Sequence, residues 1–343
     1  MGRNSKFNAL MAIVIICAFL TLGGINTYTV IFAILPIAKP LFKEMNIPWH
    51  LFTGAFFFGI ATFTMTILPG SPSVQNSIPT KYLGTTTTAA PVVGIVATIT
   101  IILYSCFYLK RQLAKSEARG ETYENMKNPD KHDSKAFEAT VKKWPPFILS
   151  ILPPIFLIVT LNVFQVDILY TLMLTVLIDI IIFWKYIDNK LQSINIGATN
   201  TVLPIINTSA DVGYGTVIAA TAGFGIITEM LANIPGSPLI SFFVAIAALA
   251  GITDTASGGL GIAMETFVPT YLDLGVDPEA LHRIATIASG SLDSLPHNGA
   301  VITVLTVIGL THKVAYKHIY FVSVIGPLVA AIPALIAAIL IYS

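Results

Sequence analysis

Long apolar stretches are the feature that most constrains this chain. Residues 9–22, 89–109 and 321–342 each approach the ~20 residues that an α-helix needs to cross a ~30 Å hydrocarbon core. Charged residues make up 11% of the chain, whereas soluble domains carry roughly 25%. So few charges cannot cover the surface of a soluble globule. The sequence therefore predicts an all-α polytopic membrane protein and excludes a soluble enzyme, a nucleic-acid-binding protein and a disordered chain.

One hydrophilic segment, residues 110–144, separates two apolar halves. It carries nine of the 19 Lys and Arg residues and has no apolar periodicity. Because short loops rich in Lys and Arg stay in the cytoplasm, this loop and the N-terminus are predicted to be cytoplasmic. The loop 271–282, with Asp273, Asp277 and Glu279, is instead predicted on the outer face.

A consistent path through the membrane follows if two apolar pairs are re-entrant hairpins. These are residues 8–38, entering from the cytoplasm, and 239–269, entering from outside. The spanning helices are then predicted at 50–68, 89–109, 146–164, 168–184, 202–223, 284–308 and 319–342.

The predicted domain organisation has three parts. The first transport half is 1–109, with hairpin 8–38, broken helix 50–79 and helix 89–109. The charged cytoplasmic loop is 110–144. The second transport half is 145–343, with hairpin 239–269, broken helix 284–308 and last helix 319–342.

Both halves repeat the same order of features. A small-residue tip at 23–27 is followed by a helix break at 68–76, and a tip at 255–259 is followed by a break at 291–299. The hairpins enter from opposite sides, so the halves are inverted. Inverted repeats with interrupted helices near mid-membrane are typical of secondary transporters.

The breaks are expected to carry the chemistry. In lipid each unmet backbone polar group costs several kcal/mol, so broken helices survive only inside protein or beside a watery cavity. Half-helix N-termini carry about half a positive charge each and can bind a carboxylate without a buried Lys or Arg. No Lys or Arg falls near the centre of any predicted span, so the helix ends would have to supply this charge.

Four ionisable residues lie within or near these features. Asp293 and His297 are four residues apart, so they share one face if the segment stays helical, and they could share a proton. The alternative is that Asp293 and His297 make a structural hydrogen bond that stabilises the broken segment of the helix. Glu265 lies either at hairpin depth, where it would titrate, or at the outer interface. Lys81 is expected near an interface, where it could attract anions.

Signatures of an enzyme are absent from the sequence. It contains no His-Glu-x-x-His, no nucleophile elbow and no phosphate loop, and a catalytic metal is not expected.

Several stretches together resemble a known family. They are residues 23–27, 63–72 with Gln75 and Asn76, 78–86, 256–260, Glu265 and 289–301. On these the chain resembles the gluconate permease (GntP) family of proton-coupled carboxylate symporters, within the ion transporter superfamily. Members of that family usually begin with additional membrane helices, so the chain is expected to be a fragment, a misassigned start or a minimal member.

The resemblance implies a fold and a function. It implies a bacterial inner-membrane permease that forms a homodimer in the lipid bilayer. The permease is expected to import gluconate or a related small hydroxy or amino monocarboxylate together with protons and to need no other cofactor. The implied substrate-binding residues are Asn26, Thr27, Ser71, Gln75, Asn76, Ser257, Gly258, Gly259, His297 and Asn298. The expected proton-coupling residues are Asp293, His297 and Glu265.

Two alternatives remain open at the level of sequence. One is a sodium-coupled carboxylate transporter, in which backbone carbonyls at 26–27 and 257–258 hold the cation. The other is a truncated membrane subunit that does not transport. The sequence does not specify which carboxylate is carried.

Overall fold

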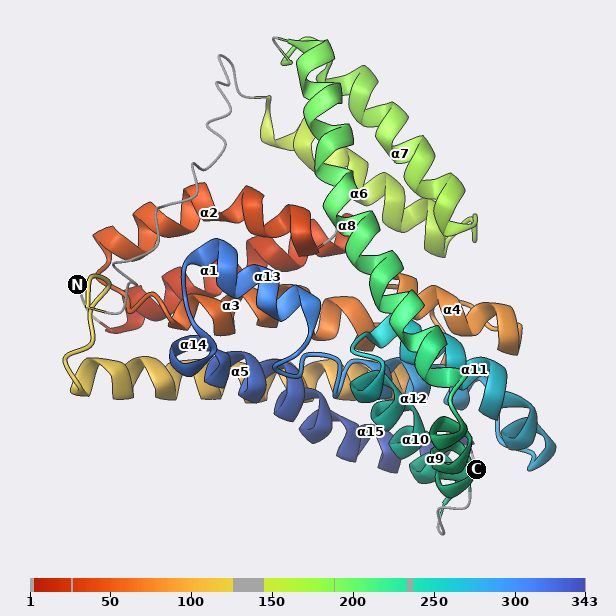
Figure 1. The fold of residues 1–343 in the computed structure, drawn as a ribbon. Coiled ribbons are helices and arrows are strands. Elements are labelled where there is room, and N and C mark those ends of the chain that lie inside the picture. The colour runs from red at the N-terminus through yellow and green to blue at the C-terminus, as the bar shows by residue number, and fades with distance from the viewer. Residues whose placement is uncertain (1–2, 26, 126–144, 188, 233–236, 343) are drawn as a thin grey trace.

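The computed structural model describes residues 3–25, 27–125, 145–187, 189–232 and 237–342, and every regular element in these ranges is a helix (Figure 1). The all-helical prediction is confirmed. In chain order the elements are α1 (Arg3–Leu22), α2 (Thr27–Glu44), α3 (Leu51–Ile60), the π-helix η1 (Phe63–Ile67), α4 (Val74–Leu83), α5 (Pro91–Ala118), α6 (Phe147–Asn162), α7 (Ile168–Phe183), α8 (Lys190–Ala219), α9 (Ala222–Ala232), α10 (Pro238–Ile252), α11 (Ala256–Asp273), α12 (Pro278–Ser289), α13 (Gly299–Ile308), α14 (His312–Ile319), the π-helix η2 (Tyr320–Ile325) and α15 (Gly326–Tyr342).

Helices α1 and α2 form the first hairpin. Its turn contains Gly24 at φ +80°, a conformation that glycine adopts without strain. The hairpin packs closely on α3, because Gly59 has no side chain: a Cβ there would lie 2.5 Å from the Cβ of Cys17. A helical hairpin whose turn ends inside the protein is the geometry expected of a re-entrant hairpin.

The first helix break lies between α3 and α4. After η1, residues 68–73 leave the helical path at Pro69 and Pro72, which have no backbone N–H to continue it. The freed backbone groups are bound by protein: Asn162 Nδ2 donates to the Gly70 carbonyl at 2.8 Å, and Asn76 Nδ2 donates to the Ser71 carbonyl at 3.0 Å. This is how a broken helix is tolerated away from bulk water.

The second half contains a matching hairpin and break. Helices α10 and α11 cross so closely that a Cβ on Gly259 would lie 2.5 Å from the Ala250 backbone. Helix α12 ends at Ser289 and α13 starts at Gly299, with residues 290–298 between them in turns.

The breaks let each half reach into the other. Helix α4 packs against α11 and α12, whereas α13 packs against α2. The apolar core has two clusters, one around α1–α3 and one around α10–α12, and the long helix α5 contributes side chains to both. Helix α15 runs alongside α5 in Figure 1 and packs on it.

Only part of the predicted span pattern has the length of a full crossing. In the described ranges, three helical segments are long and apolar enough to cross a membrane: Pro91–Ala118 and His312–Tyr342, which were predicted as spans, and Ser5–Leu22, which was predicted as part of the re-entrant hairpin 8–38. Shorter apolar helices lie at other predicted spans: Leu51–Ile67, Leu149–Asn162, Ile168–Phe183 and Gly299–Ile308. The short apolar helix Pro238–Ile252 belongs to the predicted hairpin 239–269.

Several predicted boundaries differ from the structure, among them the starts of α12 at Pro278 (predicted at 284) and of the last long helical segment at His312 (predicted at 319). Helix α5 continues to Ala118, past the expected end at 109, because residues 110–118 are mostly strong helix formers. Helix α8 starts at Lys190 and ends at Ala219, whereas the span was expected at 202–223. Residues 126–144 of the charged loop lie outside the described residues.

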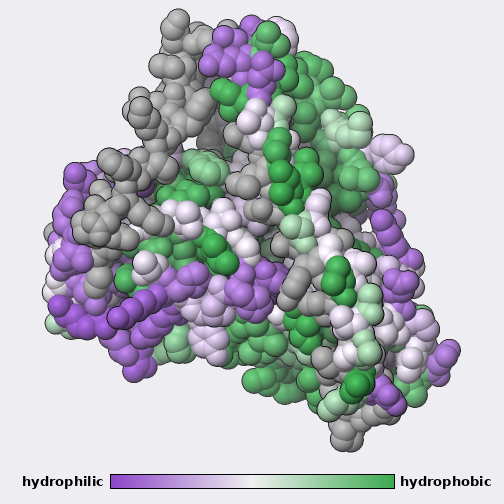
Figure 2. Space-filling view, viewed as in Figure 1, coloured by the Kyte–Doolittle hydropathy of each residue, from purple (hydrophilic) through white to green (hydrophobic). Residues whose placement is uncertain are grey.

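The surface is divided between apolar and polar regions. Figure 2 shows hydrophobic side chains over α6 and α7, where Leu169 is 68% and Ile181 is 75% exposed. Hydrophilic side chains gather at the end of the molecule that holds the N-terminus, which includes the exposed residues Lys110, Arg111 and Lys115 of α5. Apolar flanks of this kind suit contact with lipid.

Candidate functional site

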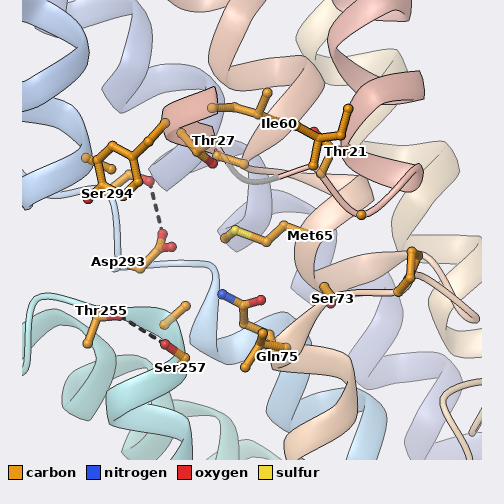
Figure 3. A pocket seen from close by; sticks show the side chains of 18 of the residues that line it. Thr21, Thr27, Ile60, Met65, Ser73, Gln75, Thr255, Ser257, Asp293 and Ser294 are labelled. Atoms are coloured by element: carbon orange, nitrogen blue, oxygen red, sulfur yellow. Dashed lines mark hydrogen bonds between the residues drawn. The ribbon is translucent and has the colours of Figure 1, made fainter. Parts of the chain in front are cut away.

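A cavity of about 280 Å³ lies where the two hairpin turns meet the two helix breaks (Figure 3). Residues of both halves line it, and Ile168 and Leu172 of α7 complete the lining. The lining residues are Thr21, Gly24, Ile25, Thr27, Tyr28, Phe57, Ile60, Ala61, Met65, Pro72, Ser73, Val74, Gln75, Ile168, Leu172, Thr255, Ala256, Ser257, Asp293, Ser294, Asn298 and Ala300.

Five helices begin at the wall of this cavity. They are α2, α4, α7, α11 and α13, and each has its first residue or its N-cap residue in the lining. Each helix N-terminus leaves four N–H groups without an intrahelical partner and carries about half a positive charge. Their convergence makes the cavity attractive to an anion, although no Lys or Arg lines it.

The N-caps differ between these helices. Ser73 accepts a hydrogen bond from Asn76 N at 3.1 Å, and Asn298 Oδ1 accepts one from Val301 N at 3.0 Å. Thr255 makes no such side-chain cap; its hydroxyl lies 3.3 Å from that of Ser257. A side-chain cap satisfies one N–H group only, so further donors remain for a ligand.

Asp293 is the one charged residue in the lining. Its side chain is buried, and Ser294 Oγ donates to its Oδ1 at 3.0 Å. In Figure 3 Asp293 and Gln75 point into the same space, beside Met65. An anionic carboxylate here would oppose the field of the helix N-termini and repel a second carboxylate.

The structure brings five of the predicted site residues to the cavity. They come from both hairpin turns and both breaks: Thr27, Gln75, Ser257, Asp293 and Asn298. Asn26 lies outside the described residues.

The other predicted residues lie elsewhere. Ser71 is buried behind the wall and donates to the Thr64 carbonyl. Gly258 and Gly259 belong to the first turn of α11, where Gly259 permits the contact with α10. Glu265 is an exposed residue of α11 and does not line the cavity.

The expected pairing of Asp293 with His297 is wrong. Residues 290–298 are not helical, so the four-residue spacing does not place the two side chains on one face. His297 Nε2 instead lies 3.4 Å from Asp254 Oδ1 and 3.2 Å from the Gly251 carbonyl, with 55% of its side chain exposed. This imidazole connects the second hairpin turn to the second break.

Asn76 belongs to a buried network rather than to the cavity lining. Its Nδ2 donates to the carbonyls of Ser71 and Thr87, at 3.0 and 2.8 Å. Its Oδ1 lies 3.2 Å from His282 Nε2 and accepts from Arg283 Nη1 at 3.1 Å. The network joins the start of α4 to α12.

Arg283 was missed because it was taken to precede a span predicted to start at 284. Helix α12 starts at Pro278, so Arg283 lies in its middle and is fully buried. The guanidinium donates to the carbonyls of Ala89 at 3.0 Å and Thr87 at 2.9 Å. Asp277 followed by Pro278 is an N-cap and first-turn signal that marks the true start.

Other lining residues were also missed, among them Thr21, Ser73, Thr255 and Ser294. Ser73 and Thr255 carried a usable signal, because Ser and Thr are preferred residues at helix N-caps. Within the described ranges, no cluster of three or more His, Cys, Asp or Glu is arranged to hold a metal ion.

Apolar helices around a cavity that also presents hydroxyl, amide and carboxyl groups are consistent with a multi-pass membrane protein, and comparison with known proteins gives its class. The chain is 34% identical over 371 aligned residues to the "Uncharacterized transporter YxjC" of Bacillus subtilis (strain 168), an alignment that covers 96% of this chain and 78% of the relative. The chain belongs to the transporter family of YxjC. No family model and no solved structure matches it.

Proposed function

We propose that this protein is a secondary symporter that imports gluconate or a related small hydroxy or amino monocarboxylate together with protons across a bacterial inner membrane. The observation that carries the proposal is the cavity of about 280 Å³, at which five helix N-termini meet one buried carboxyl group. The resemblance to the gluconate permease family supports the choice of substrate class.

The cavity chemistry suits a hydroxylated carboxylate. The helix N-termini attract the carboxylate group, while Thr27, Ser257 and Asn298 offer hydroxyl and amide groups to the rest of the molecule. Apolar residues such as Phe57, Ile60 and Leu172 limit the space for hydration. A monocarboxylate is favoured over a dicarboxylate, because no cationic side chain lines the cavity to balance a second negative charge.

Asp293 provides the coupling to protons. While its carboxylate is charged it repels the substrate anion, and protonation removes that repulsion. The substrate and the proton therefore bind together, and both leave when the cavity opens to the less acidic cytoplasm. One proton carried with one monocarboxylate moves no net charge, so the pH gradient drives this step, and only a further proton would add the membrane potential, about 2.3 kcal/mol per 100 mV.

Uptake of labelled gluconate into proteoliposomes tests this function. Uptake by the wild type should rise with an imposed inside-alkaline pH gradient and should not change when choline replaces sodium. Asp293→Asn should lose the dependence on the pH gradient. If Asp293→Asn kept that dependence, Asp293 would not be the coupling residue.

The same assay separates the two rival functions. Uptake that stops in choline would make the protein a sodium-coupled transporter. No uptake by folded protein, with activity restored by a co-expressed partner, would make it a membrane subunit.

A further inference from the structure

A second cavity, of about 480 Å³, lies beside the first and farther along α4. Its walls are α4, the loop that follows it, and the turn between α6 and α7. The lining residues are Val74, Ser77, Ile78, Thr80, Lys81, Thr85, Thr86, Thr87, Thr88, Leu161, Asn162, Gln165, Val166, Asp167, Ile168 and Leu169.

The two cavities adjoin each other. Val74, in the first turn of α4, and Ile168, in the first turn of α7, line both of them. The Val74 side chain is 58% exposed. A rotation of these two small apolar side chains would connect the cavities without any movement of a polar network.

The lining of the second cavity suits a carboxylate that also carries hydroxyl groups. Lys81 is its one cationic residue and is exposed, and among the described residues no acid lies within ion-pair distance of its ammonium group. Asp167 is the one acid in the lining, and its Oδ1 is engaged as the N-cap of α7, accepting from Leu169 N at 2.8 Å. Threonine hydroxyls and the amides of Asn162 and Gln165 surround the remaining space.

The wall of threonines is held in place from behind. Thr85 Oγ1 lies 2.7 Å from His282 Nδ1, and Thr87 Oγ1 donates to Asn162 Oδ1 at 3.0 Å. Their loop is therefore fixed to α12 on one side and to α6 on the other. A preformed wall is what a binding cavity needs, because little ordering remains to be done when a ligand binds.

The second cavity lies at the end of the molecule opposite the basic residues. The loop that lines it leads directly into the start of α5, whereas Lys110, Arg111 and Lys115 lie towards the other end of that helix. Ala90 N donates to Glu279 Oε2 at 3.1 Å, which ties this loop to the acidic first turn of α12. By the positive-inside rule, this is the outer face.

We infer that the second cavity is an outer vestibule that binds the carboxylate group of the substrate at Lys81 before the substrate passes Val74 and Ile168 into the central cavity. The inference rests on the proposed function for the identity of the ligand. A single lysine at the mouth of a cleft concentrates anions there and speeds their association, and salt weakens both effects.

The kinetic test removes the charge. With gluconate as the probe, Lys81→Gln should raise the KM for uptake about two- to fivefold at low ionic strength, as for a single exposed ion pair, and leave kcat unchanged. The difference should vanish in concentrated salt. Lys110→Gln makes the same change in charge at the opposite end of α5 and should leave KM unchanged. Equal KM values for Lys81→Gln and wild type would overturn the inference while leaving the proposed function intact.

A labelling test does not depend on transport. Thr88→Cys, in a Cys106→Ala background, places a thiol in the vestibule for a membrane-impermeant methanethiosulfonate added outside. Gluconate should slow its modification several-fold, and Lys81→Gln should weaken this protection, so that about two to five times more gluconate is needed for the same effect at low ionic strength. Leu274 is 63% exposed and does not line the second cavity. As a control, Leu274→Cys should therefore react at the same rate with or without gluconate.

The outcomes separate the two claims. Protection at Thr88→Cys without any uptake would keep the vestibule and remove the symporter function. Uptake without protection would keep the symporter function and overturn the vestibule.

Discussion

The buried side chain of Asn76 has four polar contacts within hydrogen-bonding distance, to Ser71, Thr87, His282 and Arg283. The adjacent residue Gln75 lines the cavity instead. Two neighbouring amides in the first turn of α4 therefore have different surroundings: Asn76 lies in a buried hydrogen-bond network, and Gln75 faces the cavity.

We expect Asn76→Ala to reduce the free energy of unfolding by about 2–4 kcal/mol, because it leaves several buried donors and acceptors unpaired. A thermal melt of the detergent-purified protein measures this. Gln75→Ala is the matched control and should melt close to the wild type while showing weaker gluconate uptake. A normal melting temperature for Asn76→Ala would contradict the structural role.

Gly259 offers a second comparison within one helix. A Cβ at Gly259 would lie 2.5 Å from the backbone of Ala250, whereas a Cβ at Gly261 would have no neighbour within 4 Å. Gly259→Ala should therefore cost about 1–3 kcal/mol through overpacking. Gly261→Ala should be neutral or stabilising by up to ~1 kcal/mol, because alanine favours the helix. Equal melting temperatures for the two variants would show that α10 and α11 are not in close contact.

At the scale of elements, the two breaks determine how the halves fit together. Helix α4 is fixed to α12 by the Asn76 network, and Arg283 bonds to the loop before α5. The start of α4, one of the five N-termini at the cavity, thus depends on a side chain from the other half of the chain.

Arg283→Lys tests this connection. A lysine keeps the charge but loses the planar fork that reaches Ala89, Thr87 and Asn76 together, so we expect a loss of about 2–4 kcal/mol in a thermal melt. Arg111→Lys, at an exposed position of α5, should have no measurable effect. If Arg283→Lys melted like the wild type, the guanidinium geometry would not matter for the fold.

The sequence was informative about where helices stop and less so about where side chains point. Proline and glycine marked both breaks, since these residues disrupt helical hydrogen bonding. A non-helical break has no helical periodicity, so residue spacing does not show in which direction a side chain points. For this reason the pairing of His297 with Asp293 and the placement of Ser71 in the cavity were both wrong. Arg283 was missed because its partners lie far away in the chain.

At the scale of the whole molecule, two hairpins and two breaks enclose one central cavity, and a second cavity adjoins it. Three long apolar helical segments and the shorter apolar helices provide the membrane-embedded frame in the described ranges. A transporter must expose its central cavity to each side of the membrane in turn, so residues of the lining should meet water from both sides.

Thiol accessibility across the membrane tests this most directly. Gln75→Cys and Ser257→Cys, each in a Cys106→Ala background, would be reacted with a membrane-impermeant reagent from outside and, in inverted vesicles, from inside. Both positions should react from both sides, and gluconate should slow the reaction. If neither position reacted from either side in the presence of an imposed proton gradient, the central cavity would not be a transport site.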